Sequence, residues 1–81
     1  MKLNVKLFAK ARDLAGAAAV DVELSDSACV RELRQALAVQ YPRMSALVPT
    51  LLVAIGTDYA GDETILAGNS DVACFPPVSG G

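Results

Sequence analysis

Hydrophobic residues change their spacing along this chain, and the order of these changes restricts the fold more than any other feature. Residues 2–8 and 20–24 alternate between polar and apolar side chains, as strands with one buried face do. Between residues 30 and 41 apolar side chains recur every three or four positions, which predicts a helix with one buried face. Residues 51–55 form a nearly continuous apolar run, and residues 71–75 are a last candidate strand. This order predicts an α+β domain with the helix across one face of a sheet.

Three local signals refine the expected elements. The Ser-Asp-Ser stretch at residues 25–27 can supply N-cap oxygens for the helix, and Pro42 ends it. The apolar run at 51–55 predicts a strand buried on both faces. A short edge strand is expected around Tyr59, before the last strand.

The order of two strands, a helix and two or three further strands is that of the β-grasp, or ubiquitin-like, fold. We therefore expect a mixed sheet of about five strands with one main helix packed on one face. The β-grasp domain is predicted to cover residues 1–75, and residues 76–81 are predicted to form a flexible, extended tail.

Composition argues against several classes of function. The net charge is −2 and the seven basic residues are scattered, so the electrostatic signature of a nucleic-acid partner is missing. Histidine is absent and Cys29 and Cys74 are far apart in sequence, so we expect no metal site. There is also no histidine for general base catalysis and no phosphate-binding motif, which argues against an enzyme. The alternating N-terminus does not fit a signal peptide and no stretch could span a membrane, so we expect a cytoplasmic protein without a membrane partner.

The last residues of the sequence carry the strongest indication of function. They read Phe75-Pro76-Pro77-Val78-Ser79-Gly80-Gly81. The two prolines favour an extended segment with low conformational entropy, and a glycine carboxylate can enter a narrow channel because glycine has no Cβ. These residues suit the delivery of a carboxylate into the active site of another protein. The alternative is an ordinary disordered terminus.

Aromatic residues indicate a surface for a partner. Phe8 follows the alternation of the first strand onto the face opposite the core, and Phe75 does the same in the last strand. If the two strands are neighbours, these rings lie side by side on the face without the helix, and Tyr59 extends the group. The alternative is that Phe8 only covers a loop at the end of its strand.

Several stretches together point to a family. They are Leu7-Phe8-Ala9 followed by Arg12-Asp13-Leu14-Ala15-Gly16, the helix from Val30-Arg31-Glu32-Leu33-Arg34 to Tyr41-Pro42, and Asp71-Val72-Ala73 leading into residues 75–81. Over its whole length the chain resembles the small subunit of molybdopterin synthase, the MoaD-type sulfur carriers of the ThiS/MoaD ubiquitin-like family.

The resemblance implies a sulfur-donating subunit that is not an enzyme on its own and binds no cofactor. Gly81 would be adenylated by a MoeB-like, E1-type partner that uses ATP, and then converted to a thiocarboxylate. The tail Pro76-Pro77-Val78-Ser79-Gly80 would enter a MoaE-like large catalytic subunit, where Gly81 gives its sulfur to cyclic pyranopterin monophosphate. Contacts of Phe8, Tyr59 and Phe75 would hold the two subunits together, and the complex would be a heterotetramer of two large and two small subunits.

Three other functions remain open from the residues alone. A sulfur carrier for thiamine, cysteine or tRNA thiolation would share the tail and its activation, and Pro76-Pro77-Val78-Ser79 favours the molybdopterin branch. A ubiquitin-like protein modifier would instead form isopeptide bonds with lysines. A plain binding module would use the sheet face and would not depend on Gly81.

Overall fold

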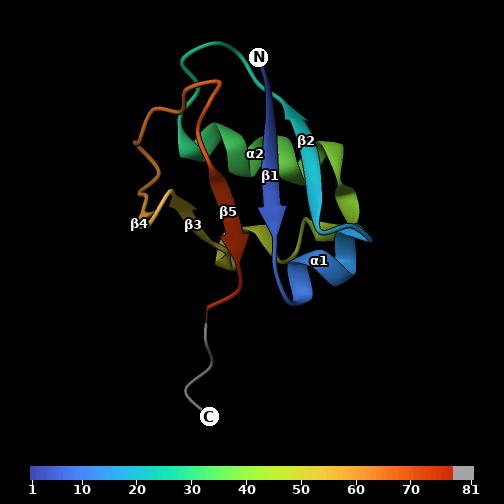
Figure 1. Ribbon diagram of the computed structural model, residues 1–81. Helices are drawn as coiled ribbons and strands as arrows, with labels where there is room; N and C mark the ends of the chain where they lie inside the picture. Colours follow the sequence, from blue (N-terminus) through green and yellow to red (C-terminus); the bar gives the residue numbers. More distant parts are fainter. Residues whose placement is uncertain (78–81) are drawn as a thin grey trace.

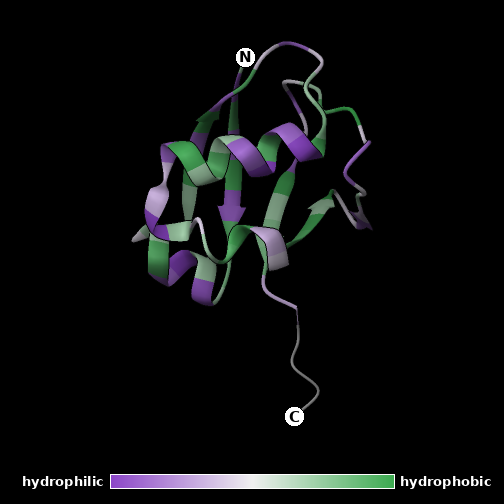
Figure 2. Ribbon diagram, turned by 180° about the vertical axis from the view of Figure 1, so that it is seen from behind, coloured by the Kyte–Doolittle hydropathy of each residue, from purple (hydrophilic) through white to green (hydrophobic). Residues whose placement is uncertain are grey.

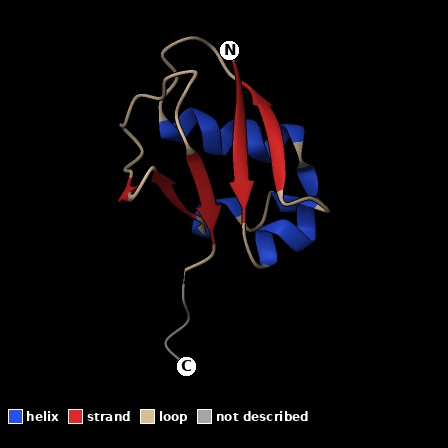
Figure 3. Ribbon diagram, viewed as in Figure 1, coloured by secondary structure: helices blue, strands red, loops and turns tan. Residues whose placement is uncertain are grey.

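A computed structural model describes residues 1–77 of the chain, which fold into one sheet with helices behind and below it (Figures 1 and 3). In chain order the elements are β1 (Lys2–Leu7), α1 (Lys10–Ala15), β2 (Ala19–Glu23), α2 (Val30–Gln40), the short 3-10 helices η1 (Pro42–Met44) and η2 (Val48–Thr50), β3 (Leu52–Ile55), β4 (Asp58–Tyr59) and β5 (Val72–Phe75). No helix within residues 1–77 is long and apolar enough to cross a membrane.

The sheet is mixed and has the strand order β2-β1-β5-β3-β4. Strand β1 pairs antiparallel with β2 and parallel with β5, while β3 pairs antiparallel with both β5 and β4. The predicted five-stranded mixed sheet with one main helix is therefore confirmed. The first two strands pair with each other, and α1 is inserted between them. Gly16 ends this helix in the left-handed conformation (φ 75°), where a glycine has no steric penalty.

The core lies between the sheet and α2, which crosses one face of the sheet (Figure 2). Leu3, Val5 and Leu7 point from β1 into this layer, as the alternation of the sequence predicts. The apolar stripe of α2 meets them from the other side. Its fully buried side chains are Val30, Leu33 and Leu37.

The predicted N-cap of the main helix is wrong by two residues. The N-cap is Cys29, whose N–H donates to the Glu32 side chain (3.2 Å), rather than a residue of the 25–27 stretch. Ser25 to Ala28 form a turn, and the side chain of Ala28 is buried. The first N–H groups of the helix are bonded by distant backbone: Val30 donates to the Thr64 carbonyl (3.0 Å) and Arg31 to the Asp62 carbonyl (3.0 Å). Tertiary contacts therefore fix the start of α2.

The prediction that the 51–55 run is buried on both faces is also wrong. Val53 points into the core, but Leu52 and Ala54 are only half-buried, because no helix covers the other face of β3. The predicted edge strand at Tyr59 is present as β4.

Candidate functional site

An apolar patch lies on the helix-free face of the sheet, over β5, β3 and β4. The strand register brings its residues together: Leu52 pairs with Phe75, and Ala54 pairs with both Ala73 and Tyr59. Residues paired across neighbouring strands share a face of the sheet. We call this surface the sheet-face patch. Its members are Phe8, Leu52, Ala54, Tyr59, Ala73 and Phe75.

Phe8 and Phe75 lie at the end of the sheet where β1 and β5 both terminate, and Tyr59 lies in the neighbouring row with Ala54 and Ala73. The rings of Tyr59 and Phe75 are in contact, with centroids 5.8 Å apart and planes inclined by 50°. Phe8 continues the ladder beyond β1 by donating its N–H to the Cys74 carbonyl (3.2 Å), which places it next to Phe75 in the register. Tyr59 is 72% exposed and Phe8 is 48% exposed, so both keep much of their area for a partner.

The other half of the same face is polar. Strands β1 and β2 present Lys2 opposite Glu23 and Asn4 opposite Asp21, and the Asn4 amide donates to the Asp21 carboxylate (3.0 Å). At the border between the two halves, Lys6 Nζ lies 3.3 Å from Asp71 Oδ1. A partner on the sheet-face patch would therefore meet an apolar centre with charged groups along one side, as protein interfaces commonly have.

Strand β5 leads from the patch into the predicted tail. Its last residue, Phe75, is followed by a half-buried Pro76 and an exposed Pro77. In Figure 1 this end of β5 lies at the same end of the molecule as α1. The predicted site residues Val78, Ser79, Gly80 and Gly81 lie outside the described residues.

The two cysteines have different surroundings. Cys74 is fully buried in β5, and this burial raises the pKa of its thiol to about 11, although the charge of Arg34 acts in the opposite direction. The thiol is therefore protonated at neutral pH and a poor nucleophile. Cys29 is half-buried at the N-terminus of α2.

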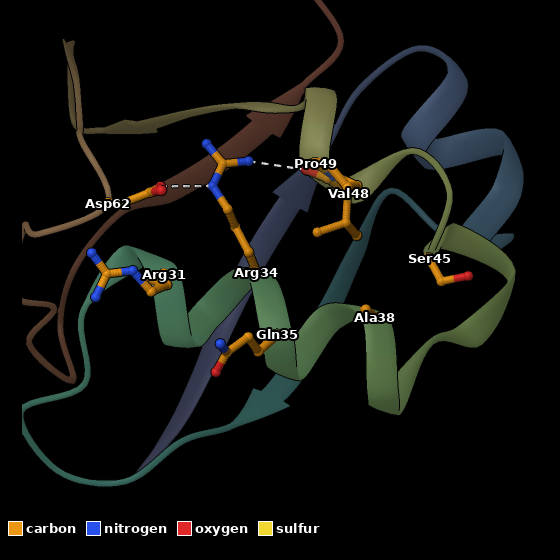
Figure 4. A pocket seen from close by; sticks show the side chains of 8 residues that line it. All are labelled: Arg31, Arg34, Gln35, Ala38, Ser45, Val48, Pro49 and Asp62. Atoms are coloured by element: carbon orange, nitrogen blue, oxygen red, sulfur yellow. Dashed lines mark hydrogen bonds and ion pairs between the residues drawn. The ribbon is translucent and has the colours of Figure 1, made fainter.

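A groove of about 430 Å³ lies between α2 and η2 (Figure 4). It lies on the helix-covered side of the sheet, opposite the sheet-face patch. Its charged side chains are bonded to the protein itself. Arg34 donates to Asp62 (2.9 Å) and to the carbonyls of Val48 (3.0 Å) and Leu51 (2.8 Å), while Arg31 forms an ion pair with Glu63.

Arg34 therefore fastens α2 to η2 and to the start of β3. Although Arg34 is not on the apolar stripe of α2, its side chain is only 21% exposed.

Sequence reasoning found the aromatic members of the patch but missed the aliphatic ones. Leu52 and Ala54 belong to a run that reads as fully buried, and Ala73 lies between two core residues of β5. One signal was available. A single main helix can cover only one face of the sheet. If a strand has apolar residues on both of its faces, the face without the helix therefore stays uncovered and is available to a partner.

Comparison with known proteins agrees with the fold and with the family suggested by the sequence. The model of the ThiS family matches residues 5–81. Two relatives are molybdopterin synthase sulfur carrier subunits: that of Chlamydomonas reinhardtii is 31% identical, with all of both chains covered, and that of Haemophilus influenzae is 35% identical, with 98% of this chain and 99% of the relative covered.

Solved structures show the same fold. The small archaeal modifier protein SAMP1 from Haloferax volcanii superposes with a TM-score of 0.87 and 28% identity, and all of both chains are covered. A chain in the complex of subunits 1 and 2 of the molybdopterin-converting factor from Helicobacter pylori, also covered completely, superposes with a TM-score of 0.67 at 18% identity, which supports the fold alone. With a family model that covers nearly the whole chain and full-length relatives above 30% identity, the chain belongs to the ThiS family and is a relative of molybdopterin synthase sulfur carrier subunits.

Proposed function

We propose that the chain is the sulfur carrier subunit of a molybdopterin synthase and that the Gly81 carboxylate is its sulfur-bearing group. The observation that carries the proposal is the position of the sheet-face patch beside β5, the strand that continues into Pro76 and Pro77. A partner bound on the patch would receive the residues that follow Phe75 directly. The full-length relatives named as sulfur carrier subunits support this assignment.

The chemistry needs an activating enzyme. A carboxylate is a poor electrophile at neutral pH, but attack of the Gly81 carboxylate on the α-phosphate of ATP gives an acyl adenylate and pyrophosphate. Sulfide then displaces AMP, which breaks the bond from the acyl carbon to the phosphate oxygen and forms a carbon–sulfur bond. The product is a thiocarboxylate. An E1-type, MoeB-like protein is the proposed source of this activation, so the small subunit needs no cofactor of its own.

The large subunit would perform the transfer itself. A MoaE-like protein would cover Tyr59 and Phe75 of the patch, and the tail would place the thiocarboxylate next to cyclic pyranopterin monophosphate. Each carbon–sulfur bond formed on the pterin would replace a carbon–oxygen bond of its side chain, and cleavage of the Gly81 acyl–sulfur bond by water would then return the carboxylate. Because a dithiolene holds two sulfur atoms, two thiocarboxylated chains would be used for each molybdopterin. In this scheme the chain is a non-catalytic subunit of a cytoplasmic heterotetramer with two large and two small subunits.

Reconstitution with the cognate large subunit tests the proposal. Thiocarboxylated chain should form molybdopterin from cyclic pyranopterin monophosphate without ATP, whereas unmodified chain should form none. A chain that lacks Gly81 is the matched control, because it should bind the large subunit but transfer no sulfur. Formation of molybdopterin by the chain that lacks Gly81 would contradict the proposal.

A protein modifier is the second candidate function, because a Haloferax volcanii structure that superposes with a TM-score of 0.85 is named small archaeal modifier protein 1. Modification would join Gly81 to a lysine amine through an isopeptide bond. Mass spectrometry of cellular proteins would find Gly-Gly remnants on lysines if the chain is a modifier and none if it is only a sulfur carrier. A carrier for thiamine, cysteine or tRNA thiolation would be thiocarboxylated equally but would not support the large-subunit reaction.

A further inference from the structure

One edge of the sheet is long enough to pair with another chain. The sheet ends at β4, which has two residues, and at β2, which has five. An uncovered edge strand presents free N–H and C=O groups and is a template for pairing with a further strand. The β2 edge is therefore the side at which a strand of another chain could pair with this sheet.

The pairing of β1 and β2 shows which groups face outward. Leu24 donates its N–H to the Met1 carbonyl (2.8 Å), and Leu7 donates to the Ala18 carbonyl (2.8 Å). Because bonded and non-bonded residues alternate in an antiparallel pair, the even-numbered residues of β2 bond to β1. The odd-numbered residues direct their backbone groups away from the sheet. They are Ala19, Asp21 and Glu23.

Two side chains from the end of α2 occupy these outward groups. The Gln40 carboxamide accepts from the Glu23 N–H through Oε1 (3.1 Å) and donates to the Glu23 carbonyl through Nε2 (3.0 Å). A paired strand would offer the same donor and acceptor from its backbone. Tyr41 donates its hydroxyl to the Asp21 carbonyl (2.7 Å), the next outward carbonyl along the strand.

We propose that Gln40 and Tyr41 form an edge clamp, which closes β2 against antiparallel pairing with a second copy of this chain. The second copy is the matching occupant because antiparallel pairing of identical strands is self-complementary about a two-fold axis. An axis at Asp21 places residue 19 of one copy opposite residue 23 of the other. It also places the two Asp21 carboxylates opposite each other, and this like-charge pair adds to the barrier. With the β2 edge closed, the sheet-face patch remains the surface at which the chain can bind another protein.

A double variant, Gln40→Ala with Tyr41→Phe, tests the clamp. It removes the three hydrogen bonds but keeps a good helix former at the end of α2 and the partly buried aromatic ring. Hydrogen exchange at the Glu23 amide should accelerate about fivefold or more, as expected for the loss of a hydrogen bond. Analytical ultracentrifugation should show a monomer for the unaltered chain and a reversible dimer for the variant as the concentration rises to millimolar.

Additional variants make the test specific. Adding Asp21→Asn removes the opposed charges and should tighten the dimer, whereas Gln35→Ala on the groove side of α2 should leave the chain monomeric. In the dimer, the amides of Ala19 and Asp21 should gain protection from exchange. Gln40→Ala alone serves as the clamp variant if the double variant does not fold. The proposal is overturned if the clamp variants stay monomeric with and without Asp21→Asn, or if a dimer protects Tyr59 and Phe75 instead of β2.

Discussion

Tyr59 offers the sharpest test of the sheet-face patch, because it is the most exposed aromatic residue of the patch. An aromatic side chain covers roughly 200 Å², so an exposure of 72% leaves roughly 140 Å² for a partner to cover. At about 25 cal/mol per Å², and with a reduction for the polar hydroxyl, complete coverage contributes about 2–3 kcal/mol to binding. Tyr59→Ala should therefore weaken binding of the large subunit about 30- to 150-fold.

The same substitution should affect folding less. The buried part of Tyr59, together with its contact to Phe75, contributes about 1–2 kcal/mol to the free energy of unfolding. Isothermal titration calorimetry gives the dissociation constant, and urea unfolding gives the stability of the same samples.

Val39→Ala is the matched control, because Val39 is 78% exposed but lies on α2, on the other side of the sheet. If Tyr59→Ala weakens binding no more than Val39→Ala does, the patch does not contact the large subunit.

Three further predictions concern stability. Arg34→Ala should lower the free energy of unfolding by about 3 kcal/mol, because two carbonyls and a carboxylate lose their donor. Urea unfolding should show a much smaller loss for the exposed Arg31→Ala control, and equal losses would refute the role of Arg34. Burial raises the pKa of the Cys74 thiol to about 11 in the folded chain, from about 9 in the unfolded chain, so the stability should fall by up to about 3 kcal/mol as pH rises from 9 to 11. Cys74→Ala should remove this part of the pH dependence. Ala9 has φ 54°, which is unfavourable for a residue with a Cβ, so Ala9→Gly should raise the melting temperature by a few degrees. A decrease would contradict a positive φ at this residue.

The parts of the fold that follow from local spacing could be predicted from the sequence. The alternation in β1 and the helical repeat in α2 each identify one buried face, and both faces meet in the core. The start of α2 could not be predicted, because carbonyls of Asp62 and Thr64, more than thirty residues away, accept its first hydrogen bonds. Spacing within a segment carries no information on such contacts.

The candidate site was predicted only in part for a related reason. Phe8 and Phe75 stand out because they break the polar pattern of an exposed face. Leu52 lies in an apolar run, and the sequence of such a run is the same whether a helix or a partner covers the face on which Leu52 lies. A charged residue such as Arg34 is expected at an exposed position, but its long side chain reaches the carbonyls of Val48 and Leu51. Charge and hydropathy indicate whether a residue is exposed, but only the fold determines which other groups its side chain can reach.

Sulfur carried by Gly81 would change the intact mass of the chain, which mass spectrometry measures. The full chain is incubated with the cognate activating enzyme, ATP and a sulfur source, and a chain that lacks Gly81 is treated in parallel. If Gly81 is the sulfur-bearing residue, one oxygen is replaced by sulfur at the C-terminus of the full chain, only when ATP is present, and the shortened chain keeps its mass. An unchanged mass of the full chain, or the same gain of sulfur in the chain without Gly81, would contradict this role of Gly81.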